Sequence, residues 1–381
     1  MSAGVVCALL CPLAAWAAPV SLQLVAGPEG GPLRPGAVNV RLNQPVQICA
    51  VVQLRGRVFS DGRLHRQRPA RSTSALGATP TWRWYRVEPR PHHLETAPPN
   101  PGNPAYSNAV LFGPHHGKWR GYDHIEYHET LLSGASASCI TVHRSHPTHP
   151  RVDVNGGLGT MRYKATLQVG ALDLTSPGME SAGRTGISPR VMRVTFRAGD
   201  DLVGYLKGFF NVPNVFGSGG AGRRHQTELY QGADCADVII GAAREAGVPL
   251  AYTSVLGFRR HARPVSDRLL MTRTGLSVAD GPDRGKAVTL RFGQEVQAGD
   301  IMLIDYVGFE GSPRGWDHIA VLDRDVGVRG VLDPNDPVLH MGYLYGLTEE
   351  PAASQAPAAI QLLRFSPRVL RKLQRGHLTQ R

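Results

Sequence analysis

Hydrophobic residues in the first half of the chain gather in short runs that predict β-strands. Clusters of Pro, Gly, Ser and His separate these runs, and β-branched and aromatic residues are frequent within them. Short apolar runs bounded by turn-forming residues are typical of strands. The expected strands are Val20–Leu24, Val46–Leu54, Thr81–Val87, Tyr163–Val169 and Val191–Phe196. We therefore expect an all-β domain of sandwich type over residues 18–197.

Two features refine this first domain. The strand that holds Cys49 is followed by Trp82 and Trp84, a combination that also occurs in immunoglobulin-like cores. The segments Gly27–Gly36 and Arg55–Thr79 are rich in Gly, Pro and Arg, which predicts loops. We expect an immunoglobulin-like arrangement in which these two loops have little order.

From about Ala198 onward, helical and strand patterns alternate, which predicts a second domain of α+β class over residues 198–365. Residues 366–381 form a basic tail with a helical pattern. The expected helices are Asp201–Phe210 and Cys235–Ala246, and the expected strands are Val288–Phe292, Ile301–Tyr306, His318–Asp323 and Ile360–Phe365.

Composition supports two globular domains and limits the classes of partner. The chain has 381 residues, of which 42% are hydrophobic and 19% charged. Its formal net charge is +12, but the arginines are spread along the chain and form no dense run. We therefore expect no nucleic-acid partner, whereas an anionic envelope polymer such as the cell wall or its acidic glycans is compatible with the charge.

The first residues predict export. An apolar run from Val5 to Ala15 precedes the small-x-small pattern Ala15-Trp16-Ala17, so residues 1–17 are interpreted as a signal peptide. Leu10 before Cys11 does not fit a lipid-attachment box. No other apolar stretch approaches the roughly 20 residues of a membrane span, so we expect a periplasmic or extracellular protein without stable membrane insertion.

Cysteine usage singles out one thiol. Of five cysteines, two leave with the leader, and Cys49, Cys139 and Cys235 remain. An oxidising compartment would permit Cys49 and Cys139, both in strand-like segments, to pair and leave Cys235 alone. The alternative of two unpaired buried cysteines stays open. A leftover thiol in an exported protein is a candidate reactive group.

Cys235 lies where a helix is expected to begin. Asp234 is a good N-cap, Asp237 has the position of a capping-box acid, and Gly247 supplies the stop. Cys235 is then the first helical residue, where unpaired N–H groups and the positive end of the helix dipole stabilise a thiolate. The sequence therefore predicts Cys235 as a nucleophile.

His318 is the candidate base, because it begins an apolar strand that follows another strand ending at Tyr306. Period-2 alternation places His318, Ala320 and Leu322 on one face, and the small Ala320 is expected to leave room there for the helix that carries Cys235.

A third polar group is needed to hold the imidazole in the right tautomer. His340 is the next candidate along the chain, with Asp333 and Asp336 as alternatives.

These segments resemble the NlpC family of cell-wall cysteine peptidases. GADCADVIIGAAREAG is similar to the family's nucleophile helix, and QAGDIMLIDY followed by WDHIAVL is similar to its two strands up to and through the catalytic histidine. VPNVFGSG and LAYTS resemble the loop before the nucleophile and the segment after its helix. The likeness covers Asp201 to Tyr345, with an insertion near Gly257–Val288. It implies a papain-like fold, a Cys-His-polar triad of Cys235, His318 and His340, and cleavage of an amide in peptidoglycan stem peptides through a thioester.

The chain departs from the family pattern beside the nucleophile. Ala236-Asp237 replaces the usual Ser-Gly, Asn214 stands where the family often has Tyr, and Asp317 stands where Gly or Ser precedes the histidine. A carboxylate at position 237 is expected to raise the pKa of the thiol. With Asp234, the residues Asn214 and Asp317 define the expected substrate or oxyanion region.

The hypothesis is an exported cysteine hydrolase that needs no cofactor. Two alternatives stay open: a non-catalytic envelope-binding or scaffold protein on a decayed peptidase fold, and an acyltransferase or amidase on the same fold. His124, Glu126 and His128 alternate as ligands on a strand would, but their spacing matches no zinc motif, so we expect no metal site.

Overall fold

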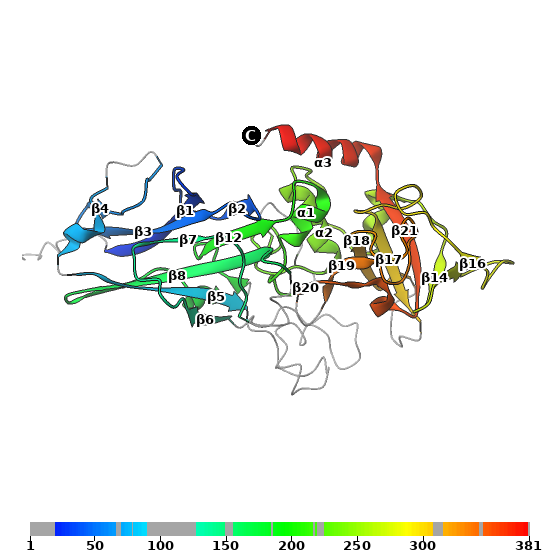
Figure 1. The fold of residues 1–381 in the computed structure, drawn as a ribbon, viewed down its shortest axis with the longest axis horizontal. Coiled ribbons are helices and arrows are strands. Elements are labelled where there is room, and N and C mark those ends of the chain that lie inside the picture. Colours follow the sequence, from blue (N-terminus) through cyan, green and yellow to red (C-terminus); the bar gives the residue numbers. More distant parts are fainter. Residues whose placement is uncertain are drawn as a thin grey trace, which may run out of the picture.

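The protein is a mixed α+β protein made mostly of strands, as Figure 1 shows for the computed structural model. The structure describes residues 20–65, 70–77, 79–89, 127–148, 155–183, 186–215, 218, 225–307, 315–342 and 346–379. The expected signal peptide, residues 1–17, lies outside the described residues, as do His124 and Glu126. No helix in the described ranges is long and apolar enough to cross a membrane.

The first half contains two main sheets. One sheet has the order β1 (Ser21–Pro28), β3 (Val46–Leu54) and β4 (Arg57–Phe59), with β7 (Cys139–Val142) also paired to β3. The other has the order β2 (Val38–Arg41), β12 (Met192–Arg197), β8 (Gly159–Val169), β5 (Thr81–Pro89) and β6 (Tyr127–Leu131), with β9 (Leu172–Thr175) paired to β8. The short elements are η1 (Thr73–Leu76), η3 (Met179–Ser181), β10 (Ala182–Gly183) and β11 (Gly186–Ile187).

Both sheets contribute side chains to one hydrophobic core. Leu24 and Ile48 reach it from the first sheet, and Trp84, Met161 and Ala165 reach it from the second. Their alternation with residues that point outward is the period-2 pattern of the sequence. The two sheets therefore enclose a common core.

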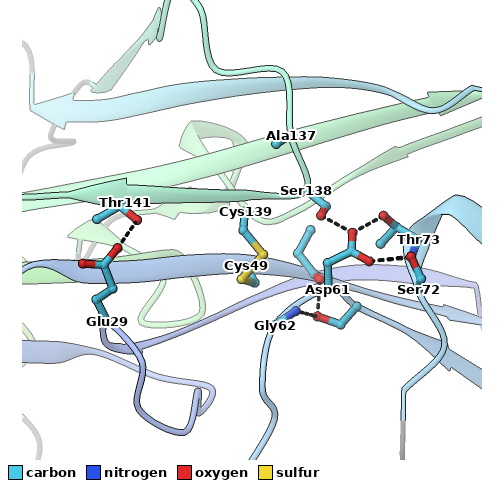
Figure 2. The surroundings of a disulfide bond; sticks show 12 residues. Glu29, Cys49, Asp61, Gly62, Ser72, Thr73, Ala137, Ser138, Cys139 and Thr141 are labelled. Carbon is cyan, nitrogen blue, oxygen red and sulfur yellow. Dashed lines mark hydrogen bonds between the residues drawn. A yellow bond between two sulfur atoms is a disulfide. The ribbon is translucent and has the colours of Figure 1, made fainter.

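A disulfide joins Cys49 of β3 to Cys139 of β7, two residues that lie directly opposite each other in the antiparallel register. Figure 2 shows the bond and its surroundings. Cys49 packs with Val25 and Leu33 in a small separate cluster, away from the core that holds Trp84. The bond therefore links neighbouring strands of one sheet, whereas an immunoglobulin-like core has its disulfide between sheets. Such a bond is compatible with an exported protein.

The expectation of two poorly ordered loops is wrong for their described parts, because both are held by hydrogen bonds. Leu33 exchanges backbone hydrogen bonds with residues 63 and 65, which ties the first loop to the second. Asp61 accepts from Ser72 Oγ at 2.8 Å, from Thr73 N at 3.0 Å and from Ser138 Oγ (Figure 2). Burial alone would raise the pKa of Asp61, but these hydrogen bonds outweigh it and lower the pKa.

The second half is built on a nine-stranded antiparallel sheet with helices against it. Its order is β16 (Ala287–Val288), β15 (Leu276–Val278), β14 (Leu269–Met271), β21 (Ala358–Phe365), β17 (Ile301–Tyr306), β18 (His318–Leu322), β19 (Pro337–Gly342) and β20 (Gly346–Pro351), with β13 (Ala262–Pro264) on β21. The helical elements are α1 (Leu202–Lys207), α2 (Cys235–Glu245), η4 (Leu256–Arg260), η5 (Ala352–Gln355) and α3 (Pro367–Thr379). In Figure 1, α1 and α2 lie between the sheets of the first half and the sheet of the second half.

One predicted strand of the second half is shorter than expected, and the sequence analysis indicated too few strands. Of the predicted strand Val288–Phe292, only Val288 belongs to a strand of the sheet, because Arg291 and Phe292 instead form isolated bridges with Val331 and Val296. The segment Gly257–Val288, interpreted as an insertion relative to the family, supplies β13, β14, β15 and β16 to the main sheet. The sheet is therefore larger than the sequence indicated.

Helix α2 lies on the other face of β18 from the one predicted. Ile319 and Val321 pack in the cluster that contains α2, whereas Ala320 and Leu322 pack in a different cluster. The alternation of β18 is as predicted, but the larger residues Ile319 and Val321 face the helix, and Ala320 lies on the opposite face. By the same alternation the side chain of His318 lies on the face of β18 away from α2, and Cys235 approaches the strand at the backbone of Ile319.

Candidate active site

The N-terminus of α2 is capped by Asp234, which fixes Cys235 as its first residue. The carboxylate of Asp234 accepts from Ala236 N at 3.0 Å and from Asp237 N at 2.8 Å. Ser218 completes the cap, because its hydroxyl accepts from Asp234 N at 3.2 Å and donates to Asp237 Oδ2 at 2.9 Å. Ser218 therefore mediates the capping-box contact that was expected from Asp237 directly.

The surroundings of Cys235 favour the neutral thiol. Burial raises the pKa of the thiol well above its ordinary value, and the carboxylates of Asp234 and Asp237 raise it further. Backbone N–H groups of Ala236 and Ile319 lower it by a smaller amount. The helix terminus alone predicted a stabilised thiolate, so the net direction is opposite to that expectation. Among the described cysteines, Cys235 is the one outside the disulfide.

The sulfur of Cys235 lies at the end of β18 where His318 begins the strand. The backbone N–H of Ile319, the residue after His318, interacts with the sulfur by a hydrogen bond that lowers the pKa of the thiol. Helix α2 packs against both β18 and β19. The two candidate residues thus come from elements that pack against each other, and the contact seen from Cys235 is to the backbone N–H of Ile319 rather than to the imidazole of His318.

A series of hydrogen bonds runs from His318 to Glu350 on the edge strand β20. His318 Nε2 lies 2.9 Å from His340 Nδ1, and His340 Nε2 lies 2.6 Å from Glu350 Oε1. The two rings are nearly perpendicular, at 88°. His340, on β19, therefore lies within hydrogen-bonding distance of the His318 ring.

The carboxylate at the end of this series determines the proton positions. Glu350 is held ionised, since the hydrogen bond from His340 lowers its pKa against the effect of burial. An ionised carboxylate only accepts, so His340 Nε2 carries a proton; when that is the ring's single proton, His340 Nδ1 accepts from His318 Nε2. The Nδ1 of His318 is then unprotonated and can accept a proton.

Further polar side chains hold this arrangement. Gln355 Nε2 donates to Glu350 Oε1 at 2.6 Å, and its carbonyl accepts from the hydroxyl of Tyr306. Thr348 Oγ1 lies 3.1 Å from His340 Nε2. Tyr306 also stacks near His318, with ring centroids 6.2 Å apart. The histidine pair is thus oriented from several sides.

His318 itself is held neutral. Burial is the main cause that lowers its pKa to about 3, and the nearby His340 lowers it as well, while Glu350 acts in the opposite direction. The resting site therefore combines a neutral thiol with a neutral imidazole. A proton can move from one to the other only when charge develops during attack.

The competing carboxylates of the sequence analysis have other partners. Asp336 is fully buried and accepts from Val326 N at 2.8 Å and Asp333 N at 3.0 Å. Asp333 accepts from Asn335 N at 2.7 Å. Both residues stabilise the turn before β19 and leave the orienting position to His340.

The predicted substrate residues lie around the nucleophile segment and the hairpin. Asn214 is buried and forms a bridge with Ala233, two residues before Cys235. Asp317 accepts from Tyr306 N at 2.9 Å and so holds the β17–β18 hairpin closed. Burial and the nearby Asp305 raise the pKa of Asp317, while the Tyr306 N–H opposes this.

Glu350 was missed in the sequence, although a signal was present. In the β19–β20 hairpin His340 pairs with Thr348, and alternation puts Glu350 on the same face as Thr348. Glu350 follows His340 by ten positions, so pairing across the hairpin rather than order along the chain brings the two together. Within the described residues, no group of three or more His, Cys, Asp or Glu side chains is arranged to hold a metal ion.

Comparison of the chain with family models, curated proteins and solved structures finds no match.

Proposed function

We propose that this protein is an exported cysteine hydrolase of NlpC type that cleaves a peptide or isopeptide amide. Cys235 is the nucleophile, His318 the general base, and His340 the residue that orients it. The observation that carries the proposal is the series of hydrogen bonds from His318 through His340 to Glu350, because it orients the His318 ring and, with a single proton on His340, leaves Nδ1 of His318 able to accept a proton. In this proposal the second half is a papain-like domain and the first half a sandwich that binds the wall or a partner.

The reaction follows from the resting proton positions. As the sulfur of Cys235 attacks the amide carbonyl, its proton moves to Nδ1 of His318, and a tetrahedral intermediate forms. The backbone N–H of Cys235 at the start of α2 donates to the oxyanion. His318 then protonates the leaving amine, which gives a thioester on Cys235. A water molecule, deprotonated by the same nitrogen, releases the acid and restores the thiol.

The carboxylate of Glu350 compensates the charge that forms on His318 during the proposed reaction. When His318 becomes an imidazolium, the ionised Glu350 stabilises the charge through His340. This matters because the pKa of Cys235 is raised and that of His318 is lowered to about 3, so no preformed ion pair supplies the thiolate. Base assistance during attack replaces a resting thiolate.

The substrate class comes from the NlpC resemblance and from export. The proposed substrate is an amide in a peptidoglycan stem peptide or a related envelope polymer. The formal net charge of +12 favours association with such anionic polymers. The disulfide in the first half is compatible with that location.

One observation favours a second candidate function. The neutral resting thiol and the nearby carboxylates of Asp234 and Asp237 would suit a scaffold protein that has lost activity on a peptidase fold. An active hydrolase and an inactive scaffold protein are expected to give different results in the same experiment.

Purified muropeptides are incubated with wild type and Cys235→Ala, and products are separated by chromatography with mass detection. Hydrolysis that is lost in Cys235→Ala supports the proposal. Equal hydrolysis by both proteins contradicts it, and turnover by neither supports the scaffold. Transfer of the acyl group to an added amine identifies an acyltransferase instead.

A further inference from the structure

The first half of the protein contacts the segment that leads into the nucleophile helix. Tyr230 lies five residues before Cys235 and is fully buried. Its ring stacks on Phe209 with centroids 4.2 Å apart. Two arginines of the first half, which we call the β-rich half, contact this tyrosine: Arg162 on β8 and Arg193 on β12.

Each arginine holds a different part of Tyr230. The guanidinium of Arg162 donates to the backbone carbonyl oxygen, and the guanidinium carbon of Arg193 lies 3.9 Å from the ring centroid. Arg162 is only 2% exposed. Burying a guanidinium is unfavourable unless its hydrogen bonds are made, so its placement against a backbone carbonyl is a strong constraint on the chain there.

The backbone at Tyr230 needs such a constraint. Its φ is +55°, a left-handed conformation that costs a non-glycine residue on the order of 1 kcal/mol or more. The turn sends the chain through Gln231 toward Asp234, the cap of α2. A change in this turn would move the start of the helix and the thiol with it.

A second contact follows directly. Gln231 is buried, and its Nε2 donates to the carbonyl oxygen of Ile187 at 2.6 Å. Gly186 permits this approach, since its φ is +100° and a Cβ there would lie 3.0 Å from Gln231 Cβ. Two successive residues before the nucleophile helix are thus held by the β-rich half.

The far end of α2 is held by the same half. Asn39 of β2 donates to Glu245 Oε2 at 3.4 Å, and Glu245 is the last residue of the helix. The positive charge of Arg193 also acts on Glu245. Arg193 therefore connects the turn before α2 with the end of α2.

We infer that Arg193 and Arg162 are positioning residues for Cys235, and that the β-rich half is an integral part of the catalytic site through their contacts with Tyr230. This inference rests on the proposed function for its meaning in catalysis. The contacts themselves predict that thiol reactivity depends on residues of the other half.

The test compares Arg193→Met and Arg193→Lys in the full chain, with Arg190→Met as a matched control at an exposed arginine. Because small displacements of a nucleophile reduce turnover strongly, we expect Arg193→Met to lower kcat by about tenfold to a hundredfold while KM changes little. Arg193→Lys keeps a cation near the ring and should recover part of kcat.

A second readout needs no substrate. Alkylation of Cys235 by iodoacetamide, followed by peptide mass spectrometry, should slow in Arg193→Met and recover in Arg193→Lys at temperatures where near-ultraviolet circular dichroism reports folded protein. The inference is overturned if Arg193→Met lowers only the melting temperature while both rates match Arg190→Met. If wild type hydrolyses no amide, the proposed function fails, and the alkylation rates still decide the positioning role.

Discussion

His318 Nε2 and His340 Nδ1 lie 2.9 Å apart, at the junction of β18 and β19. At this separation one of the two ring nitrogens donates the hydrogen bond and the other accepts it. Glu350 determines the division, because it accepts from the far nitrogen of His340. The orientation of the proposed base is therefore set by a residue 32 positions away in sequence, on the second strand of the β19–β20 hairpin.

Substitution of Glu350 tests this relay. Glu350→Gln keeps a carbonyl oxygen that accepts from His340 but removes the charge, so kcat/KM should fall on the order of tenfold. Glu350→Ala loses both functions, and we expect a loss of about a hundredfold or more. Steady-state hydrolysis of the muropeptide substrate measures both values.

The neighbouring Glu349→Gln is the control for this series, because Glu349 pairs with Lys207 and Arg324 on the other side of the strand. It should hydrolyse the substrate at nearly the wild-type rate. Full activity of Glu350→Ala would remove Glu350 from the account.

Asp237→Asn tests the electrostatics of the thiol. The carboxylate of Asp237 raises the pKa of Cys235, so its neutralisation should lower that pKa and increase the fraction of thiolate at a given pH. We expect the pH profile of Cys235 alkylation to move to lower pH. The exposed Asp283→Asn serves as the control and should leave the profile unchanged. A profile that stays in place in Asp237→Asn would contradict the stated cause.

The depressed pKa of His318 predicts a loss of stability in acid. The unfolded chain binds a proton near the ordinary histidine pKa of about 6.5, whereas the folded protein binds it only near a pKa of about 3. The stabilisation is therefore complete above pH 6.5 and is lost as the pH falls toward 3, by at most about 1.4 kcal/mol per pH unit. Denaturant unfolding of wild type and His318→Asn measures it. The same acid dependence in both proteins would argue against His318 as the group.

Local sequence signals predicted the elements that carry the site better than the packing between them. The strands Val46–Leu54 and Ile301–Tyr306 and the start of α2 follow from alternation and from the cap at Asp234. The prediction of which face of β18 packs against α2 was wrong, because alternation defines two faces and only tertiary packing selects between them. Glu350 and Arg193 were missed for the same reason, since both act through contacts distant in sequence.

The disulfide predicts a separate effect on stability. It closes a loop with a sequence separation of 90, which in the chain-entropy description stabilises the fold by about 4–5 kcal/mol. Cys49→Ala/Cys139→Ala should lower the free energy of unfolding by an amount of that order. Alkylation of Cys235 in the folded double variant should be unchanged, and a large change in that rate would mean that the disulfide also shapes the site.

The most direct measurement is the rate of iodoacetamide alkylation of Cys235 in wild type and in His318→Ala, followed across pH at the level of single peptides. If Nδ1 of His318 takes the thiol proton during attack, His318→Ala should react at Cys235 about a hundredfold more slowly at neutral pH. Equal rates in the two proteins at every pH would contradict the account, because the imidazole would then play no part in activating the thiol.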